Sequence, residues 1–324
     1  MDHPAIATAA PGYRPRRSCL AVPGSNPRML DKAQGLPSDQ VFMDLEDAVA
    51  PVAKESARDN VVSALRTGSW GNRIRAVRVN DLTTKWTYRD ILTVVEGAGD
   101  CLDCIVLPKV ADASHVIWLD LTLAQIEKSV GLAPGAIGIE AQIESAAGLM
   151  NVDGIAAASK RVQTIVFGPA DFMASIEMPS LVVGGLSPDY PGDPFHYALM
   201  RILIAARAHD VQAIDGPYLL IHDRDGYAAT ARRSRALGYD GKWVLHPSQL
   251  DLANEIYAPS QDEYDHAERI LETYAISTSE AGGARGALML GDEMIDEASR
   301  KMALVIAAKG RAAGLRRTDA TVAG

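Results

Sequence analysis

Residues Ile137–Ser145 read IGIEAQIES, an apolar run of strand length that ends at a carboxylate, Glu144. The next run of this kind, Val162–Asp171, reads VQTIVFGPAD and ends at Asp171. Both runs have the length and the β-rich composition that are typical of a buried strand. The pattern predicts two successive strands, each with an acidic side chain at its C-terminal end.

Six further runs of the same kind extend this pattern along the chain. They lie at Ser18–Gly24, Gln40–Glu46, Ile74–Asn80, Cys104–Val110, Gln212–Tyr218 and Lys242–Ser248. The run at Gln212–Tyr218 has the weakest strand character. Helical patterns lie between most of the runs, at Pro27–Ala33, Ala53–Leu65, Arg89–Ala98, Ala113–Val130, Tyr197–Ala208 and Gly226–Leu237. Strands that alternate with helices are joined by crossovers, so we expect them to be parallel.

Eight such units over roughly 230 residues match the size of a closed (β/α)8 barrel, which takes about 250 residues. We therefore predict an α/β fold of the TIM-barrel type. The alternative is a doubly wound open sheet, which would carry a GxGxxG turn after its first strand. The first strand is followed instead by Gly24-Ser25-Asn26, so the barrel is favoured.

Polar residues gather at the C-terminal ends of the predicted strands. They are Glu46, Asp47, Arg78, Asn80, Lys109, Glu144, Asp171, Asp215 and His246. In a (β/α)8 barrel these ends converge on one mouth, where catalysis takes place. A solvated loop or a helix cap would explain any one of these residues, whereas their shared position indicates an active site.

The two carboxylates Glu144 and Asp171, on adjacent strands, are expected to converge on one metal ion. Oxygen ligands alone suit Mg²⁺, or Mn²⁺ in its place, and no cluster of soft ligands favours Zn²⁺. Two unrelated helix N-caps are the alternative. Glu46 and Asp47 would accept hydrogen bonds from metal-bound water, or else form ion pairs with a nearby Arg or Lys.

Arg78 lies inside an otherwise apolar strand and is predicted to face the mouth. Its guanidinium suits a carboxylate or an enolate oxygen. A structural salt bridge to Glu46 or Asp47 is the alternative.

His246 fits either an active-site or a structural imidazole. His196 follows the long insert Ile176–Phe195, which we interpret as a lid.

Composition excludes several classes of protein. The 324 residues have a net charge of −9 and a pI of about 5.3, which argues against nucleic acid or membrane phosphates as partners. No apolar run approaches the ~18–20 residues of a membrane helix. Residues 1–15 lack a signal-peptide pattern and are expected to form a flexible leader.

The three cysteines, Cys19, Cys101 and Cys104, fit a reduced, cytoplasmic setting. Cys101 and Cys104 form a CxxC motif, but a zinc site usually needs a second ligand pair, and no His or Cys cluster follows. We therefore interpret Cys101 as a helix-end residue and Cys104 as a strand residue.

Nine collinear stretches resemble one known family. They are Arg16–Leu30, Asp44–Arg58, Val77–Asn80, Leu107–Val110, Glu140–Gly148, Gly168–Phe172, Ile214–Tyr218, Gly241–Gln249 and Gly291–Asp296. The chain resembles the citrate lyase β-subunit-like family (HpcH/HpaI aldolase/citrate lyase), and within it the malyl-CoA and β-methylmalyl-CoA lyases.

This resemblance implies a barrel at 16–275 and a C-terminal extension at 276–324 that completes the active site of a neighbouring subunit in a homotrimer or hexamer. It implies Mg²⁺ at Glu144 and Asp171, and Arg78 on the substrate carbonyl or enolate oxygen. It also implies that Asp296 enters the neighbour's site as a catalytic residue. From the residues alone, Asp296 is interpreted as the N-cap of a helix at Glu297–Lys309.

A coenzyme A thioester is the substrate that the resemblance implies. Arg17, Arg28 and Lys32 are candidates for binding its phosphates, although the stretch Cys19–Pro23 departs from the family pattern there.

The expected reaction is a Mg²⁺-dependent, reversible carbon–carbon cleavage of malyl-CoA or β-methylmalyl-CoA. It yields glyoxylate and acetyl-CoA or propionyl-CoA. The alternatives are citramalyl-CoA or citryl-CoA as substrate, a malate synthase-like outcome, a Mg²⁺ aldolase without CoA, and a citrate lyase subunit that acts on an acyl-carrier-protein thioester. A metabolite-binding protein without activity is the non-enzymatic alternative.

Overall fold

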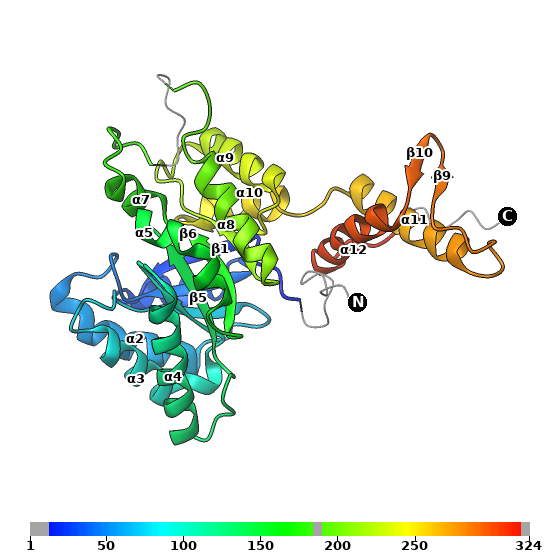
Figure 1. Ribbon diagram of the computed structural model, residues 1–324. Helices are drawn as coiled ribbons and strands as arrows, with labels where there is room; N and C mark the ends of the chain where they lie inside the picture. The colour runs from blue at the N-terminus through cyan, green and yellow to red at the C-terminus, as the bar shows by residue number, and fades with distance from the viewer. Residues whose placement is uncertain (1–12, 184–189, 319–324) are drawn as a thin grey trace. The chain divides into compact units, whose positions relative to one another are not determined.

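The computed structural model describes residues 13–183 and 190–318, and its ribbon is drawn in Figure 1. The chain divides into two compact units, one at Arg16–Tyr257 and one that combines the residues before Arg16 with those from Ala258 onward. Most of the expected leader at 1–15 lies outside the described residues, and so do residues 184–189 of the expected lid.

The first unit is a closed barrel of eight parallel strands, which follow one another in chain order. Strand β8 pairs with β1, with Trp243 opposite Cys19, and so closes the sheet. The predicted (β/α)8 barrel is confirmed, and the open-sheet alternative is wrong. The strands are β1 (Ser18–Pro23), β2 (Gln40–Asp44), β3 (Ile74–Arg78), β4 (Cys104–Leu107), β5 (Gly138–Ile143), β6 (Val162–Phe167), β7 (Gln212–Asp215) and β8 (Gly241–Val244).

Helices connect the strands and pack on the outer face of the barrel. Local sequence starts several of them: the Asn26 side chain accepts a hydrogen bond from the Met29 N–H, and Pro27 is the first helical residue of α1. The α-helices of this unit are α1 (Pro27–Ala33), α2 (Lys54–Thr67), α3 (Thr87–Ala98), α4 (Ala113–Ser129), α5 (Ala146–Met150), α6 (Val152–Ala157), α7 (Pro169–Ser175), α8 (His196–Ala208), α9 (Arg224–Leu237) and α10 (Leu250–Ile256).

Alternate strand residues fill the interior of the barrel. Phe42 and Trp243 lie there with ring centroids 4.3 Å apart, whereas Val41 belongs to the apolar layer between strands and helices. At the N-terminal ends of the strands, Arg16 donates from Nε to Glu140 at 3.0 Å. The floor of the barrel is therefore polar and paired, and the predicted catalytic and metal-binding residues of the barrel lie toward the other end.

The second unit contains α11 (Gln261–Thr278), β9 (Leu288–Leu290), β10 (Glu293–Ile295) and α12 (Glu297–Ala312). Strands β9 and β10 form an antiparallel hairpin. Helices α11 and α12 pack closely at Gly310, where a Cβ would lie 2.3 Å from the Tyr264 ring. The amphipathic helix predicted at Glu297–Lys309 is thus confirmed.

The division between the units falls earlier than the expected boundary between residues 275 and 276, which lies inside α11. Helix α11 belongs to the second unit because its buried residues Tyr264, Ala267 and Ile270 form a core with α12. Hydrophobic periodicity predicts a helix but does not say which neighbour covers its apolar face.

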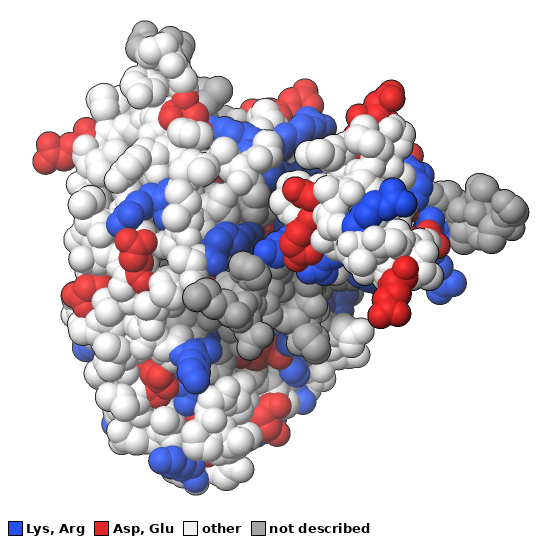
Figure 2. Space-filling view, turned by 45° about the vertical axis from the view of Figure 1, so that its right-hand side comes forward, with Lys and Arg blue, Asp and Glu red and all other residues white. Residues whose placement is uncertain are grey.

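Acidic and basic side chains are mixed over the face drawn in Figure 2. Within residues 13–183 and 190–318, none of the helices combines the length and apolar character required to cross a bilayer.

Candidate active site

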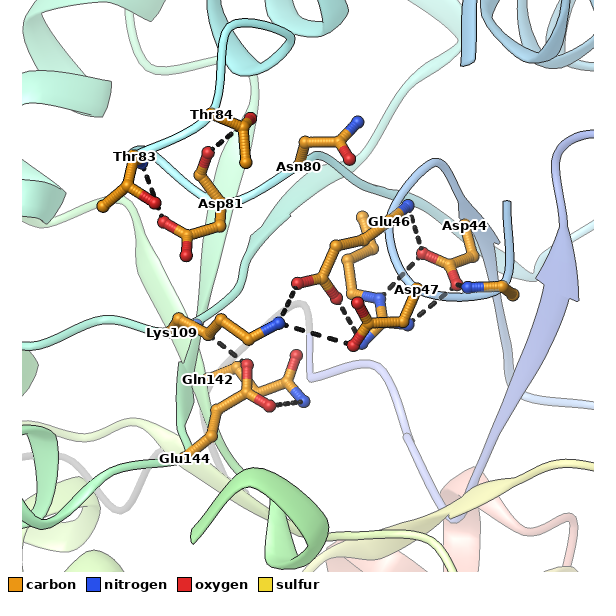
Figure 3. A network of polar contacts seen from close by, with 12 residues as sticks. Asp44, Glu46, Asp47, Asn80, Asp81, Thr83, Thr84, Lys109, Gln142 and Glu144 are labelled. Atoms are coloured by element: carbon orange, nitrogen blue, oxygen red, sulfur yellow. Dashed lines mark hydrogen bonds and ion pairs between the residues drawn. The ribbon is translucent and has the colours of Figure 1, made fainter. Parts of the chain in front are cut away.

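The C-terminal ends of β2 to β5 bring side chains together at the barrel mouth (Figure 3). Arg78 is the last residue of β3, and each of the other residues in this set lies near the end of its strand or just beyond it. We call this set the mouth network. Its members are Asp44, Glu46, Asp47, Arg78, Lys109, Gln142 and Glu144.

Arg78 is a buried cation at the centre of the mouth network. Its Nε and Nη2 donate to Oδ1 and Oδ2 of Asp44 at 2.8 and 2.7 Å, and its Nη1 lies 2.9 Å from Oε2 of Glu46. Its guanidinium carbon lies 5.2 Å from the centre of the Trp243 ring. Burial opposes the charge, but the carboxylates outweigh it and raise the pKa of Arg78. The salt bridge that the sequence left open for Arg78 is therefore present with Glu46, and Asp44 adds a second one.

Lys109 supplies a second cation to the mouth network. Its Nζ lies 2.5 Å from Oε1 of Glu46 and 3.4 Å from Oδ2 of Asp47. Glu46 is buried, whereas Asp47 is largely exposed. Burial raises the pKa of Glu46 above its usual value, and Arg78 and Lys109 both oppose that rise. The ionised form of Glu46 therefore depends on both cations.

Glu144 is the more deeply buried acid of the predicted metal pair. Its Oε1 accepts a hydrogen bond from the backbone N–H of Lys109 at 2.8 Å, and its Oε2 accepts one from Nε2 of Gln142 at 3.0 Å. Burial raises the pKa of Glu144 well above its usual value, and the charges of Glu46 and Asp171 raise it further. The negative charge of Glu144 is thus poorly compensated by the protein alone.

Asp171 lies in the first turn of α7, and its charge acts on the Glu144 carboxyl group. The preceding loop packs directly on Glu144, because a Cβ at Gly168 would lie 2.6 Å from Oε2 of Glu144. Glycine is required at this position for the close approach of the backbone to the carboxylate. The packing of Gly168 and the influence of the Asp171 charge on Glu144 indicate that the two predicted metal ligands lie near each other.

The donors at this place fit a hard divalent cation. The pair Glu144 and Asp171 offers oxygen ligands, and the buried Oε1 of Gln142 beside them has no hydrogen-bond partner. Across residues 13–183 and 190–318 there is no group of three or more His, Cys, Asp or Glu arranged to hold a metal ion. Mg²⁺ needs no such group, since it takes one or two protein carboxylates and completes its shell with water and substrate oxygens. Mn²⁺ accepts the same ligands.

The three predicted coenzyme A contacts separate in the structure. Arg17 precedes β1 at the floor of the barrel, where its Nε lies 2.7 Å from Oδ2 of Asp39. This position, at the other end of the strands from the mouth, does not support the predicted coenzyme A contact of Arg17. Arg28 and Lys32 are exposed on α1, and Lys32 lines a cavity of about 150 Å³ between α1 and the ends of β1 and β8.

Three other polar strand ends have structural partners. Asn80 donates from Nδ2 to the Leu45 carbonyl and to Asp90. Asp215 pairs with Lys242 at 2.6 Å, away from the interior side chains of their strands. His246 caps the short helix η4 (Pro247–Gln249), which fits the structural imidazole that the sequence left open.

Asp296 lies in the second unit as the N-cap of α12. Its Oδ1 accepts hydrogen bonds from the N–H groups of Ala298 and Ser299 at 2.9 and 3.0 Å. These bonds lower the pKa of Asp296 below its usual value. The cap interpreted from the residues alone is confirmed, and it does not exclude a second role, because the other carboxylate oxygen makes neither of these bonds.

Sequence reasoning assigned no role to Asp44, and named Lys109 only as one of the polar strand ends. Period-two alternation contains the signal for Asp44, since it lies two residues after the inward-facing Phe42. Lys109 adopts a left-handed backbone with φ of 52°, which its side-chain chemistry does not predict.

Known proteins share this architecture and sequence. Residues 17–247 match the family model described as HpcH/HpaI aldolase/citrate lyase. The chain is 40% identical over 305 residues to the L-malyl-CoA/beta-methylmalyl-CoA lyase of Cereibacter sphaeroides. The match covers 91% of this chain and 95% of that relative. The chain is 34% identical over 303 residues to citrate lyase subunit beta of Escherichia coli, covering 94% and 96% of the two chains.

A solved structure agrees with these relatives. The CitE protein of Mycobacterium tuberculosis, in complex with magnesium, acetoacetate and coenzyme A, matches with a TM-score of 0.68 and 27% identity. The match covers 94% of this chain and 99% of that one. The chain belongs to the HpcH/HpaI aldolase/citrate lyase family, whose members named here are lyases.

Proposed function

We propose that this protein is a Mg²⁺-dependent carbon–carbon lyase that cleaves malyl-CoA or β-methylmalyl-CoA reversibly. The products are glyoxylate and acetyl-CoA or propionyl-CoA. The observation that carries the proposal is the 40% identity to an L-malyl-CoA/beta-methylmalyl-CoA lyase over 91% of the chain. The mouth network supports it, because it contains a buried Arg78 and the carboxylate of Glu144, which feels the charges of both Arg78 and Asp171.

Glu144 and Asp171 would hold the metal ion. When bound, Mg²⁺ supplies a Lewis acid that polarises the oxygen atoms of the hydroxy acid or keto acid. Because this carboxylate pair occupies at most two coordination positions if each acid is monodentate, positions remain for substrate and water.

Arg78 would stabilise the enolate that forms on the thioester side when the carbon–carbon bond breaks. A guanidinium has five N–H groups; Asp44 accepts hydrogen bonds from one on Nε and one on Nη2, while Nη1 forms an ion pair with Glu46. The remaining N–H groups of the two terminal nitrogens are available for an oxyanion. Because two hydrogen bonds to Asp44 hold one edge of the guanidinium, the positive charge of Arg78 is oriented before the enolate develops.

In the cleavage direction, the hydroxyl proton of the substrate would pass to solvent water, the carbon–carbon bond would break, and its electron pair would pass into the thioester enolate. Asp296 of a neighbouring subunit, in its protonated form, would then give its proton to that carbon to yield acetyl-CoA or propionyl-CoA and would be left as a carboxylate. In condensation, the same carboxylate would remove the methyl proton. This role requires a homotrimer or hexamer in which the extension crosses between subunits. Arg28 and Lys32 would bind coenzyme A phosphates beside the α1 cavity.

The test is a coupled assay of glyoxylate release from malyl-CoA by the purified protein with Mg²⁺. Excess EDTA and the Asp296→Asn variant serve as controls. We expect release that EDTA abolishes and that Asp296→Asn lowers far more than it lowers binding of the CoA ester. No release from a protein shown to bind Mg²⁺ would reject malyl-CoA as the substrate.

A second candidate is a citrate lyase subunit that acts on an acyl-carrier-protein thioester, favoured by the 34% identity to the Escherichia coli subunit. Turnover of free CoA esters by the lone chain excludes dependence on partner chains. The same assay with citramalyl-CoA and citryl-CoA tests the other acyl groups. Release of free coenzyme A, followed with a thiol reagent, would indicate a malate synthase-like outcome.

The three cysteines of the chain are free, and this agrees with a reducing cytoplasmic setting for the proposed reaction.

A further inference from the structure

Lys109 has a backbone conformation that is rare for a residue with a side chain. Its φ is 52°, in the left-handed region that glycine favours. A residue held there is stabilised by its surroundings, and such residues concentrate at functional sites. Lys109 lies just beyond β4, at the barrel mouth.

The turn at Lys109 aims its backbone at the predicted metal pair. The Lys109 N–H donates to Oε1 of Glu144 at 2.8 Å, and the next N–H, of Val110, donates to the Gln142 carbonyl at 3.2 Å. One oxygen of Glu144 is thereby held by the loop after β4, while the other accepts from Gln142. The backbone of Lys109 therefore orients the Glu144 carboxylate.

The side chain of Lys109 acts on the opposite part of the mouth network. Its Nζ lies 2.5 Å from Oε1 of Glu46, whose Oε2 lies 2.9 Å from Nη1 of Arg78. Glu46 is thus held between two cations, with one on each carboxylate oxygen. Without the Lys109 side chain, Oε1 of the buried Glu46 would lose the cation beside it. Glu46 would then be a carboxylate near the proposed metal ligands Glu144 and Asp171 with one oxygen no longer paired to Lys109.

Glu46 is the natural competitor for the metal. Lys109 contacts both acids, since its Nζ lies 2.5 Å from Oε1 of Glu46 and its backbone N–H donates to Oε1 of Glu144 at 2.8 Å. A divalent cation attracts any carboxylate within reach. A third carboxylate ligand would fill a coordination position that substrate oxygens need, and it would also leave Arg78 with one partner fewer.

We propose that Lys109 is a positioning residue that keeps Glu46 off the metal while its backbone N–H orients Glu144. The ion is then bound by Glu144 and Asp171, and positions remain open for substrate. This inference rests on the metal-binding role proposed for that pair.

The test is the affinity for Mg²⁺, measured by calorimetry, with Mn²⁺ binding followed by electron paramagnetic resonance as a second readout. Lys109→Met keeps the length of the side chain and removes its charge. We expect Mg²⁺ to bind about tenfold more tightly to this variant, because a nearby positive charge is lost and Glu46 is released to the ion. We expect kcat to fall at the same time. If the substitution only damaged the local structure, both the Mg²⁺ affinity and kcat would fall.

The double variant Lys109→Met with Glu46→Gln separates the two causes of tighter binding. If Glu46 is the competitor, the double variant returns the Mg²⁺ affinity close to that of the wild-type protein. Equal tightening in the single and double variants would overturn the proposal, as would an unchanged or weaker affinity in Lys109→Met.

Two further variants guard against misfolding. Lys109→Gly removes the side chain and also relieves the backbone, so it is expected to fold and to bind Mg²⁺ as Lys109→Met does. Asp210→Gly is its matched control, because Asp210 has a φ of 57° and is exposed before β7, at the floor of the barrel. It should leave metal affinity and turnover unchanged.

Glu144→Gln distinguishes failure of this inference from failure of the proposed function. If the wild-type protein binds no Mg²⁺, or binds it equally well after Glu144→Gln, the metal pair is rejected and the role of Lys109 with it. If Glu144→Gln abolishes binding and Lys109→Met changes nothing, the role of Lys109 alone is rejected.

Discussion

Asp44 and Arg78 face each other across adjacent strands, as register partners at the C-terminal ends of β2 and β3. Two hydrogen bonds of 2.8 and 2.7 Å join them, and both side chains are buried. The pair therefore fixes the guanidinium at the point where the strands open into the mouth.

Asp44→Asn tests this relationship. This substitution leaves the buried Arg78 with Glu46 as its remaining ion-pair partner, and Glu46 is shared with Lys109. We therefore expect a loss of up to about 3–5 kcal/mol in the free energy of unfolding, together with a lower kcat. Urea denaturation at pH 7 measures the first quantity. Asp100→Asn is the control, because its ion pair with Arg66 is exposed and is expected to contribute less than about 1 kcal/mol. Equal effects of the two substitutions would contradict the role of Asp44.

The same pair predicts a pH dependence. The Arg78 ion pair and its hydrogen bonds lower the pKa of Asp44 against the effect of burial, so the unfolded chain takes up this proton first as the pH falls. The contribution of Asp44 is present above the unfolded-state pKa of about 3.9 and is lost as the pH falls through the folded-state pKa. The difference in unfolding free energy between wild type and Asp44→Asn should therefore shrink below about pH 4. A difference that grows there would reject this assignment.

Gly168→Ala is expected to impair metal binding without unfolding the barrel. The added Cβ would lie 2.6 Å from Oε2 of Glu144 and would push the carboxylate out of place. Mg²⁺ affinity, measured by calorimetry, should fall about tenfold or more. Gly154→Ala, in α6, is the matched control, because its Cβ meets Ala113 at an ordinary 3.9 Å. Similar Mg²⁺ affinities in the two variants would show that Gly168 does not support the site.

Cysteine labelling tests the interpretation of the CxxC motif. Cys104 starts β4 and is buried, and burial raises its pKa to about 12, while burial also raises the pKa of Cys19. A thiol reacts as its thiolate, so neither should react appreciably with maleimide at pH 8 in the native protein. Cys101, at the end of the short helix η3 (Gly99–Cys101), is partly exposed and should react first. Mass spectrometry before and after unfolding in guanidinium counts the labels. Native labelling of Cys104 as fast as that of Cys101, or bound zinc, would contradict this interpretation.

Complementation tests whether the extension crosses between subunits. Asp296→Asn should keep α12 intact, because asparagine caps a helix about as well as aspartate. Co-expressed Asp296→Asn and Glu144→Gln chains should together recover up to about one quarter of wild-type activity, since random mixing joins an intact barrel to an intact extension at one site in four. Each variant alone should be nearly inactive in the glyoxylate assay. No recovery in verified mixed oligomers would indicate that each chain uses its own Asp296.

Two features could not be predicted from local sequence: the boundary between the two units and the position of Arg17. Helix α11 has an apolar face that suits either a barrel or a partner helix, and contacts with α12 decide between them. Arg17 is basic and close in sequence to Arg28, yet the strand β1 between them separates floor from mouth. A strand rises about 3.3 Å per residue, so its six residues place the two arginines at opposite ends of the barrel.

By itself, the sequence determined the alternation of strand and helix, the closed parallel barrel, and the placement of Glu144, Asp171 and Arg78 at strand ends. These follow from local periodicity and from the rule that parallel strands open at a common edge. Tertiary structure alone decided that Arg78 pairs with Asp44 and that Lys109 turns left-handed to hold Glu144 and Glu46. Such contacts join residues far apart in the chain, and their geometry depends on strand register and on burial, neither of which a local pattern contains.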